Sequence, residues 1–322
     1  MTPIQSEDRR KCEVAVIGEV FVELQSTNAS LTAAESYTKR LGGSAALVAA
    51  AASALGSHVC ITAAVGADAL GTFIQNSLQK HDVDVSCLQY SRDHPTSIMF
   101  KARSGKLTQE LPYRYADWHL HSTREHIHRI QNCAVIYGSG YILWKNPARH
   151  SLLELLRVAR KADIPTIFYP YFESRLWRSR SDAYSVMKKT LQSIDIITPT
   201  IEVAERFFGK QSHEDTVKRY HDISAKNVIL NLGNDGCLVS TENDRMQHIS
   251  PPAPVDFDAP GVNEVFQAAF LVAIQHGKEL EAATRFALAA ESYVNQNAGQ
   301  ELDLPSTETI CQEVLHTAFD EL

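Results

Sequence analysis

Short apolar runs alternate with amphipathic segments along most of this chain. The run at 12–24 begins with β-branched residues, which predicts a buried strand up to Gly18 and then a strand with one exposed face. Further strands are predicted at 58–66, 133–139, 165–170, 194–200, 227–233 and 236–241. Helices are predicted within 42–56, 69–83, 123–132, 148–162, 182–193 and 202–209, and from about 264 and 280 onward.

This alternation of strands and helices is typical of βαβ units. We therefore expect an α/β fold in which helices cover both faces of a central, mostly parallel sheet. No repeat or Pro/Ser-rich linker interrupts the pattern, so residues 1–322 are expected to form a single domain. Ser122 and Glu125 form a capping-box pattern, which predicts the start of the helix at 123–132.

Two segments do not fit the central sheet. Residues from about 19 to 42 contain an alternating strand, and residues 96–116 alternate and turn at Ser104-Gly105, which predicts a hairpin. We expect the two segments to form a small second sheet, a lid over the carboxyl edge of the central strands. Ligands of open α/β sheets bind at that edge.

Composition narrows the possible functions. The chain is 44% hydrophobic and 21% charged, as in ordinary globular proteins. Its net charge of -7 leaves no basic excess to neutralise phosphates, so no nucleic-acid partner is expected. The six cysteines form no CxxC pair, which indicates free thiols in a cytoplasmic protein. No apolar run reaches the roughly 18 residues of a membrane span, so we expect no membrane association.

Four histidines, His119, His121, His126 and His128, lie close together in the sequence. The first pair precedes the predicted helix and the second pair is spaced i, i+2 within it, so the four side chains do not share one face. We therefore expect no metal site there.

The segment DFDAPGVNEVFQAAF, at 256–270, has the form of a catalytic loop. It passes from acids through Pro260 and Gly261 into an apolar helix start, and a helix N-terminus offers unpaired N–H groups to an anion. The segment therefore predicts a phosphate-binding site or the remains of one. Glu264 is also favourable at a helix N-terminus through the helix dipole alone, so a structural role for it stays open.

Eight short motifs occur in the order and spacing of the ribokinase/PfkB carbohydrate kinases, a family that the chain resembles over nearly its whole length. The motifs are GEVFVE (18–23), GGSAALVA (42–49), VGADALG (65–71), YR (113–114), FYPYFESRLW (168–177), ITPTIEVAERFFG (197–209), NLGNDG (231–236) and APGVNEVF (259–266). The 2-keto-3-deoxygluconate kinases and related deoxygluconokinases are the most similar branch. The resemblance implies a ribokinase-like fold, a small sugar-like ligand or nucleotide, and transfer of phosphate from ATP with Mg²⁺.

The resemblance also assigns roles to the residues of the catalytic loop. Gly261, Val262, Asn263 and Glu264 stand where the family has GAGD, a turn that binds phosphoryl charge and ends in the catalytic base. Glu264 carries its carboxylate on a longer arm, and a displacement of roughly an ångström can cost about 100-fold in rate. Asn263 can adopt the left-handed conformation usual for glycine, but its side chain would project toward the phosphate.

Of the other family positions near the nucleotide, some keep the family residue and others do not. Gly233 and Gly236 retain the pattern and would shape the backbone beside the nucleotide, although NLGNDG is equally explained as a hairpin turn. The NxxE motif, which supports magnesium and phosphate, aligns with 200–203 and ends in Val203 instead of an acid.

The expected substrate pocket departs further from the family. Leu47 replaces a sugar-binding asparagine, and a buried hydroxyl without a partner costs about 1–3 kcal/mol. The DxNxR strand end becomes Tyr169, Tyr171 and Glu173, so polar groups of the cleft are replaced or change sign. Four pocket positions keep the family pattern: Gly42, Gly43, Glu23 and Arg114. Of these, Glu23 keeps the acid of the first strand but has a side chain longer by one carbon.

These departures leave three hypotheses open. The chain is a pseudokinase with lost or strongly reduced phosphotransfer that acts as a regulatory, scaffolding or ligand-sensing partner of another protein. Alternatively, it is an active ATP-dependent carbohydrate kinase with Glu264 as base, or its cleft performs other chemistry on a sugar-like or nucleotide-like ligand. ATP and Mg²⁺ are required cofactors only if transfer survives. The resemblance also predicts a homodimer in which two lids pair.

Overall fold

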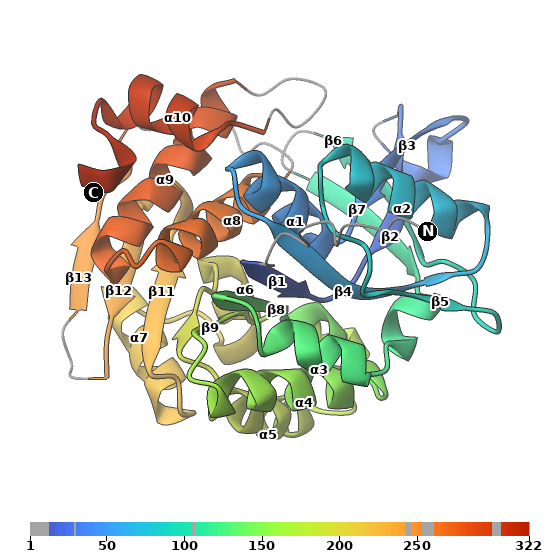
Figure 1. The fold of residues 1–322 in the computed structure, drawn as a ribbon, viewed down its shortest axis with the longest axis horizontal. Helices are drawn as coiled ribbons and strands as arrows, with labels where there is room; N and C mark the ends of the chain where they lie inside the picture. Colours follow the sequence, from blue (N-terminus) through green and yellow to red (C-terminus); the bar gives the residue numbers. More distant parts are fainter. Residues whose placement is uncertain are drawn as a thin grey trace, which may run out of the picture.

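A nine-stranded sheet forms the centre of the part of the chain that this computed structural model describes, residues 13–28, 30–104, 107–242, 246–252, 261–297 and 304–321 (Figure 1). The strand order is β13-β12-β11-β10-β9-β8-β1-β4-β5. The strands are β1 (Val14–Ile17), β4 (Val59–Gly66), β5 (Leu88–Ser91), β8 (Val135–Ser139), β9 (Thr166–Tyr169), β10 (Ile196–Ile197), β11 (Asn227–Asn231), β12 (Cys237–Ser240) and β13 (Met246–Ile249). Among the described strands of this central sheet, only the β11–β12 and β12–β13 pairs are antiparallel, so the predicted mostly parallel α/β sheet is confirmed.

A second, four-stranded sheet lies beside the β4–β5 edge of the central sheet (Figure 1). Its order is β3-β2-β6-β7, and its strands are β2 (Phe21–Ser26), β3 (Tyr37–Gly42), β6 (Ile98–Ser104) and β7 (Leu107–Tyr113). β6 and β7 pair antiparallel from Ile98–Tyr113 to Ser104–Leu107, as expected for a hairpin. Gly105 of the predicted turn lies outside the described residues.

Helices cover both faces of the central sheet (Figure 1). One face carries α1 (Ser44–Ala54), α2 (Ala69–Lys80), α8 (Val262–Gln275) and α9 (Leu280–Gln296), with α10 (Thr307–Ile310) packed on α9. The other carries α3 (Arg124–Ile130), α4 (Ala148–Lys161), α5 (Arg180–Leu191), and α7 (His213–Asp222) beside α6 (Ile201–Phe208). None of the helices in the described ranges combines the length and apolar character needed to cross a lipid bilayer.

Strand β1 explains why the central strands are apolar without alternation. Val14 and Val16 belong to the core on the α1 and α8 side, whereas Ala15 and Ile17 belong to the core on the α4 side. Successive side chains of a strand point to opposite faces, so a sheet covered on both faces requires apolar residues at every position.

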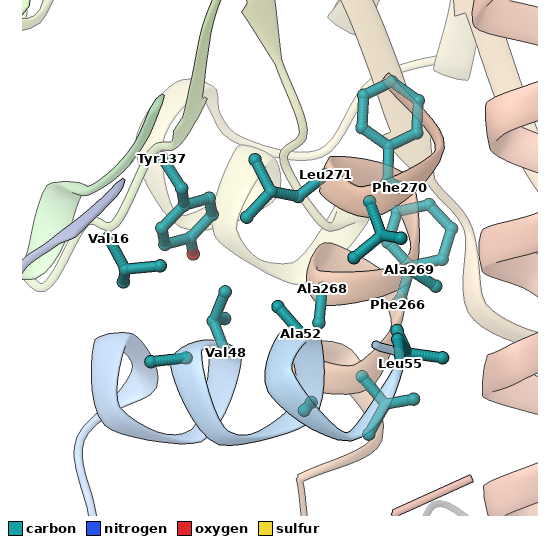
Figure 2. Close-up of a cluster of buried hydrophobic side chains, with 14 of the residues drawn as sticks. Val16, Val48, Ala52, Leu55, Tyr137, Phe266, Ala268, Ala269, Phe270 and Leu271 are labelled. Carbon is teal, nitrogen blue, oxygen red and sulfur yellow. The ribbon is translucent and has the colours of Figure 1, made fainter. Parts of the chain in front are cut away.

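Helix α1 is apolar on most of its surface because α8 and the sheet enclose it. Its side chains are mainly alanines, which let the two helices approach closely. Figure 2 shows Val48 and Ala52 of α1 facing Ala268 of α8, with the Tyr137 ring of β8 beside them. Helix α1 is thus an internal element of the core. It follows the glycine pair of the GGSAALVA motif and packs against α8, the helix that follows the catalytic loop.

Local details at α3 and α7 differ from the sequence-based expectation. The cap of α3 is Thr123, whose hydroxyl accepts the N–H of His126, whereas Ser122 donates to Glu154 on α4 instead of capping α3. The capping-box assignment was therefore wrong by one residue, because a tertiary hydrogen bond took Ser122. Helix α7 was missed because its ten residues are strongly polar and bury only Thr216, Val217 and Tyr220.

We expect Phe270→Ala to lower the free energy of unfolding by about 3–5 kcal/mol, because the ring is fully buried between α8 and the sheet and its loss leaves a cavity. Urea unfolding at neutral pH measures this change. Tyr90→Ala, which removes a ring that is 46% exposed on β5, serves as the control and should cost less than half as much. Equal losses for the two variants would contradict the packing described here.

Candidate functional site

A cavity of about 690 Å³ lies between the second sheet, the start of α1 and the start of α8. Parallel strands β1, β8 and β9 end there, as expected for a ligand site in an open α/β sheet. Nine of the residues predicted from the sequence line it, namely Glu23, Gly43, Leu47, Tyr169, Tyr171, Gly261, Val262, Asn263 and Glu264. Residues separated by more than 200 positions in the chain are therefore brought to one wall.

Five predicted residues do not line this cavity: Gly42, Arg114, Glu173, Gly233 and Gly236. Gly236 has φ +83° and a Cβ there would lie 2.1 Å from the Ile249 carbonyl oxygen, so the glycine is required by the β12–β13 backbone itself. Gly233 has φ +63° with open space around it. The tight-turn explanation of NLGNDG is thus sufficient for both glycines.

The start of α8 forms the phosphate end of the predicted site. Gly261 is left-handed, with φ +83° and ψ 0°, and as the N-cap of α8 it has no side chain that could cap the helix. Asn263 is helical, so the left-handed residue of the loop is Gly261 rather than Asn263. The Asn263 side-chain oxygen accepts a hydrogen bond from Gln267 at 3.4 Å, along the helix. Backbone N–H groups at a helix N-terminus suit an anion such as a phosphate.

Glu264 faces an arrangement of charges supplied by the second sheet. Removal from water raises the pKa of its carboxyl, and the Lys101 ammonium on β6 opposes that shift. Lys101 Nζ itself lies 2.8 Å from Glu23 Oε2 and 3.5 Å from Glu110 Oε1. Burial lowers the pKa of Lys101, but the two carboxylates outweigh burial, so the pKa is raised and the group stays charged. Glu23, the retained acid of the first motif, is therefore engaged in an ion pair.

The end of β9 presents aromatic side chains to the cavity. Tyr169 is 8% exposed and belongs to the apolar core, and the rings of Tyr171 and Tyr141 lie 4.3 Å apart between centroids. Burial raises the pKa of Tyr171 to about 12, so its hydroxyl is neutral at physiological pH. With Leu47 from α1, this wall offers apolar area and neutral hydroxyl groups where the family pattern has charged and amide groups.

Arg114 is committed to structural contacts behind the cavity. Its Nε donates to Asp117 at 2.8 Å, its Nη1 donates to the Tyr141 carbonyl at 3.1 Å, and its guanidinium stacks 4.2 Å from the Tyr141 ring centroid. Glu173 forms an ion pair with exposed Arg175 at 3.1 Å. Arg114 supports Tyr141 from behind and does not pair with Glu173.

The position expected to support magnesium lacks a suitable ligand. Val203 is 5% exposed and packs into the core, while Thr200 caps α6 by accepting the Val203 N–H at 3.4 Å. Within the described ranges, no group of three or more histidine, cysteine, aspartate or glutamate side chains is placed to hold a metal ion, the four histidines included. The residues present fit a phosphate group at α8, but Val203 does not fit the metal-supporting role.

Among the lining residues that sequence reasoning missed, four contribute polar groups to the site described here: Glu19, Ser44, Lys101 and Tyr141. Glu19 is 1% exposed, and its Oε1 accepts the Ser44 N–H at 2.8 Å at the start of α1. Burial raises its pKa to about 7, while the Ser139 hydroxyl and the Arg114 charge limit the rise. An acid directly after Gly18 was the available signal for Glu19, whereas nothing in the alternation of β6 distinguishes Lys101 from a solvent-facing lysine.

Glu19 should make the free energy of unfolding depend on pH. Its folded-state pKa of about 7 exceeds the ordinary 4.5, so its contribution is most favourable below pH 4.5 and is lost as pH rises to about 7. Wild type should lose about 3 kcal/mol relative to Glu19→Gln across that interval. Urea unfolding of both proteins at several pH values measures the difference. Parallel curves would show that Glu19 titrates normally.

Known proteins share this architecture along nearly the whole chain. A family profile described as pfkB family carbohydrate kinase matches residues 11–307. The ATP-dependent 6-phosphofructokinase of Thermoanaerobacterium thermosaccharolyticum is 30% identical over 304 residues, covering 94% of each protein. The 5-dehydro-2-deoxygluconokinase of Clostridium perfringens is 26% identical over 324 residues, covering 96% of this chain and 95% of the relative.

Solved structures agree with the sequence relatives. Halothermothrix orenii fructokinase has a TM-score of 0.76 and 27% identity, with 90% of this chain and 99% of that one covered. Aminoimidazole riboside kinase from Salmonella enterica has a TM-score of 0.80 and covers 95% of this chain and 100% of its own, but at 22% identity it supports the fold alone. The chain therefore belongs to the pfkB family of carbohydrate kinases.

Proposed function

We propose that this chain binds a small ligand in the cavity but transfers phosphoryl groups slowly or not at all, and that it acts as a regulatory or ligand-sensing member of its family. One observation carries the proposal: four of the residues that depart from the family pattern gather on one cavity wall. Leu47, Tyr169, Tyr171 and Glu264 come from three elements that are distant in sequence, and all four line the same space. Replacements concentrated in this way change the chemistry of the site and leave the fold intact.

Binding at the phosphate end is retained in this proposal. N–H groups at the start of α8, which begins at Val262, would donate to phosphate oxygens of ATP. When bound with Mg²⁺, ATP would supply a phosphoryl group for transfer. Magnesium would lack the expected support at Val203, which packs into the core.

Transfer requires more than binding, because the base and the sugar hydroxyl must be held within a fraction of an ångström of their productive positions. Glu264 differs from the family aspartate by one methylene, and Leu47 offers no hydrogen bond to a hydroxyl. Glu23 is held by Lys101 at 2.8 Å. Base position and substrate orientation are therefore altered together, which supports a strongly reduced rate.

One observation favours an active kinase as the alternative. Glu264 lies at the start of α8 in the cavity, and removal from water raises its pKa, which brings a carboxylate closer to the range of an efficient general base. The curated relatives that match along the chain are named as kinases. The two functions differ in whether a sugar accelerates the release of ADP.

We expect millimolar ATP with Mg²⁺ to raise the melting temperature, because a ligand that binds only the folded state stabilises it. We expect no ADP release above background when D-fructose, fructose 6-phosphate or 5-dehydro-2-deoxygluconate is added, as followed by a coupled assay. A sugar-dependent rate near 1 s⁻¹ or above, ordinary for enzymes, would establish the active kinase instead. If ATP produces no thermal shift, ATP does not bind, and neither of the two proposed functions can involve this nucleotide.

Glu264→Ala should change any residual transfer by less than about 10-fold, because a carboxylate that is out of position contributes little general-base catalysis. Glu214→Gln, which alters an acid in the first turn of α7, is the matched control for a helix-terminal charge. The measurement is the initial rate of ADP formation at saturating ATP. A loss of about 100-fold or more confined to Glu264→Ala would identify a working base.

We also propose that two copies pair through the outer face of the second sheet. Tyr37, Leu111 and Tyr113 are 37%, 47% and 46% exposed, and the Phe100 ring lies 5.3 Å and 5.8 Å from the rings of Tyr37 and Tyr113. Four apolar side chains on one sheet face are an unusual surface for a monomer. A second copy that presents the same face would cover them with two-fold symmetry.

Light scattering should give a dimer at micromolar concentrations, and Leu111→Glu/Tyr113→Glu should give a monomer with an unchanged circular dichroism spectrum. The double variant should be monomeric because the dimer interface would remove its two introduced carboxylates from water. Glu110→Gln changes a neighbouring position that points to the cavity and should leave the dimer intact. A wild-type monomer throughout the micromolar range would contradict the pairing.

A further inference from the structure

All three tryptophans of the chain lie together, outside the cavity. Trp118, Trp144 and Trp177 follow strands β7, β8 and β9, and each is partly exposed. The rings of Trp118 and Trp144 lie 4.3 Å apart between centroids. Arg149 connects this pair to the third ring, because its Nη2 donates to the Trp144 carbonyl at 2.6 Å and its guanidinium lies 5.4 Å from the Trp177 centroid. The three indoles therefore form one surface, which we call the aromatic corner.

Positive charge accompanies the indoles of the aromatic corner. Lys145 Nζ lies 3.9 Å from the Trp118 ring centroid, a cation–π contact. Lys145 and Arg178 are exposed, and neither forms an ion pair among the described residues. Burial lowers the pKa of Arg149, the charge of Asp182 opposes that shift, and the charge of Arg178 adds to it. Arg149 and Arg178 therefore repel each other, and their positive charge is available to an anion.

The excess of positive charge is local. Residues 144–149 and 173–182, which carry Trp144 and Trp177, contain five lysines and arginines but only two carboxylates, whereas the whole chain has a net charge of -7. One of the two carboxylates, Glu173, is already paired with Arg175 at 3.1 Å. Tryptophan and arginine are the residues that contribute most often to binding energy at protein interfaces. Charge and residue type therefore both indicate a docking surface for an acidic partner.

The ring contacts favour an acidic peptide over a nucleic acid. Bases bind by stacking on open aromatic faces. Here Lys145 lies over Trp118, the Trp118 and Trp144 rings lie against each other, and Arg149 lies near Trp177. The net charge of the chain also repels a long polyanion. An acidic peptide carries fewer charges than a nucleic acid, and its apolar side chains can cover the exposed parts of the indoles.

We propose that the aromatic corner docks an acidic segment of a partner protein, whose carboxylates pair with Lys145 and Arg178 while its apolar side chains cover the indoles. The inference goes beyond the proposed function, because it holds whether or not the cleft transfers phosphoryl groups. The docked segment would also lie near the cavity wall. The Arg114 guanidinium lies 5.9 Å from the Trp118 ring centroid and 4.2 Å from that of Tyr141, which lines the cavity.

The test uses the full chain and a short fluorescein-labelled peptide of glutamates with interspersed leucines, followed by fluorescence anisotropy. We expect the wild type to bind this probe at low ionic strength and to release it in 1 M salt, where charges more than about 3 Å apart are screened. Lys145→Glu/Arg178→Glu should weaken binding about 10-fold or more, because two attractions become repulsions. The unlabelled peptide should also change the intrinsic tryptophan emission of the wild type, since every tryptophan of the chain lies at the aromatic corner.

Lys188→Glu/Lys189→Glu is the matched control, because it makes the same change of charge at two exposed positions in the last turn of α5. It should change the affinity less than about 2-fold, and circular dichroism should show that both double variants are folded. Three results would each overturn the docking surface: no binding by the wild type, wild-type affinity in a folded Lys145→Glu/Arg178→Glu protein, or binding without a change in tryptophan emission.

Two further measurements separate this inference from other claims. Tighter binding of single-stranded DNA than of the peptide would assign the surface to nucleic acid and overturn the choice of partner. Peptide binding by a protein whose melting temperature does not respond to ATP would support the docking surface while contradicting the proposed binding of ATP in the cavity. The docking surface and the proposed function therefore fail separately.

Discussion

The close contact between Gly43 and the end of β1 is the constraint on which the arrangement of the cleft depends. Gly43 has φ +98°, and a Cβ at this position would lie 2.5 Å from the Glu19 carbonyl oxygen and 2.9 Å from Val20 Cα. No other residue fits such a contact without a shift of backbone. Because the contact holds the start of α1 against Glu19, the Glu19 carboxylate reaches the Ser44 N–H, and α1 enters the core at the angle that lets it pack along α8.

The same constraint brings the late catalytic loop into the cleft. Helix α8 lies against α1 through small residues, and Gly261 with the first residues of α8 lines the same cavity as Glu19 and Ser44. The second sheet completes the wall with Lys101, whose ion pair with Glu23 links sheet and cleft. Shape and anion-binding geometry therefore follow from the backbone, which the substitutions at Leu47 and Tyr171 leave undisturbed. Transfer chemistry follows from side chains, and those have changed.

The fold was predictable because its causes are local and repeated. Runs such as 14–17 are apolar at every position since they are covered on both faces, and the glycine motifs mark backbone that no other residue allows. Much of the cleft could be predicted as well, since Glu23, Gly43, Leu47, Tyr169 and Glu264 lie together on its wall. These positions were recognised through their alignment with family motifs, which preserve register even when the side chain differs.

The rest could not be predicted because it depends on contacts across the fold. Arg114 has the same sequence context as a substrate-reading residue, but Asp117 and the Tyr141 carbonyl take its donors. Glu19 becomes a buried group with a pKa of about 7 because the folded chain removes its carboxylate from water. Lys101 enters the cleft from β6, and the alternation of apolar and polar residues in that strand does not show which face lines the cleft. Burial, partner and direction are tertiary properties, and they decide the chemistry of these three residues.

The most direct measurement of the central claim, that the cleft binds without transferring, is a single-turnover experiment with γ-labelled ATP. Enzyme in excess over labelled ATP is mixed with Mg²⁺ and saturating D-fructose, then quenched over times from milliseconds to an hour. The account predicts that the nucleotide is bound while the label remains on ATP, with transfer slower than about 10⁻² s⁻¹, at least 100-fold below ordinary kinase rates. Label appearing on the sugar at 1 s⁻¹ or faster would contradict it.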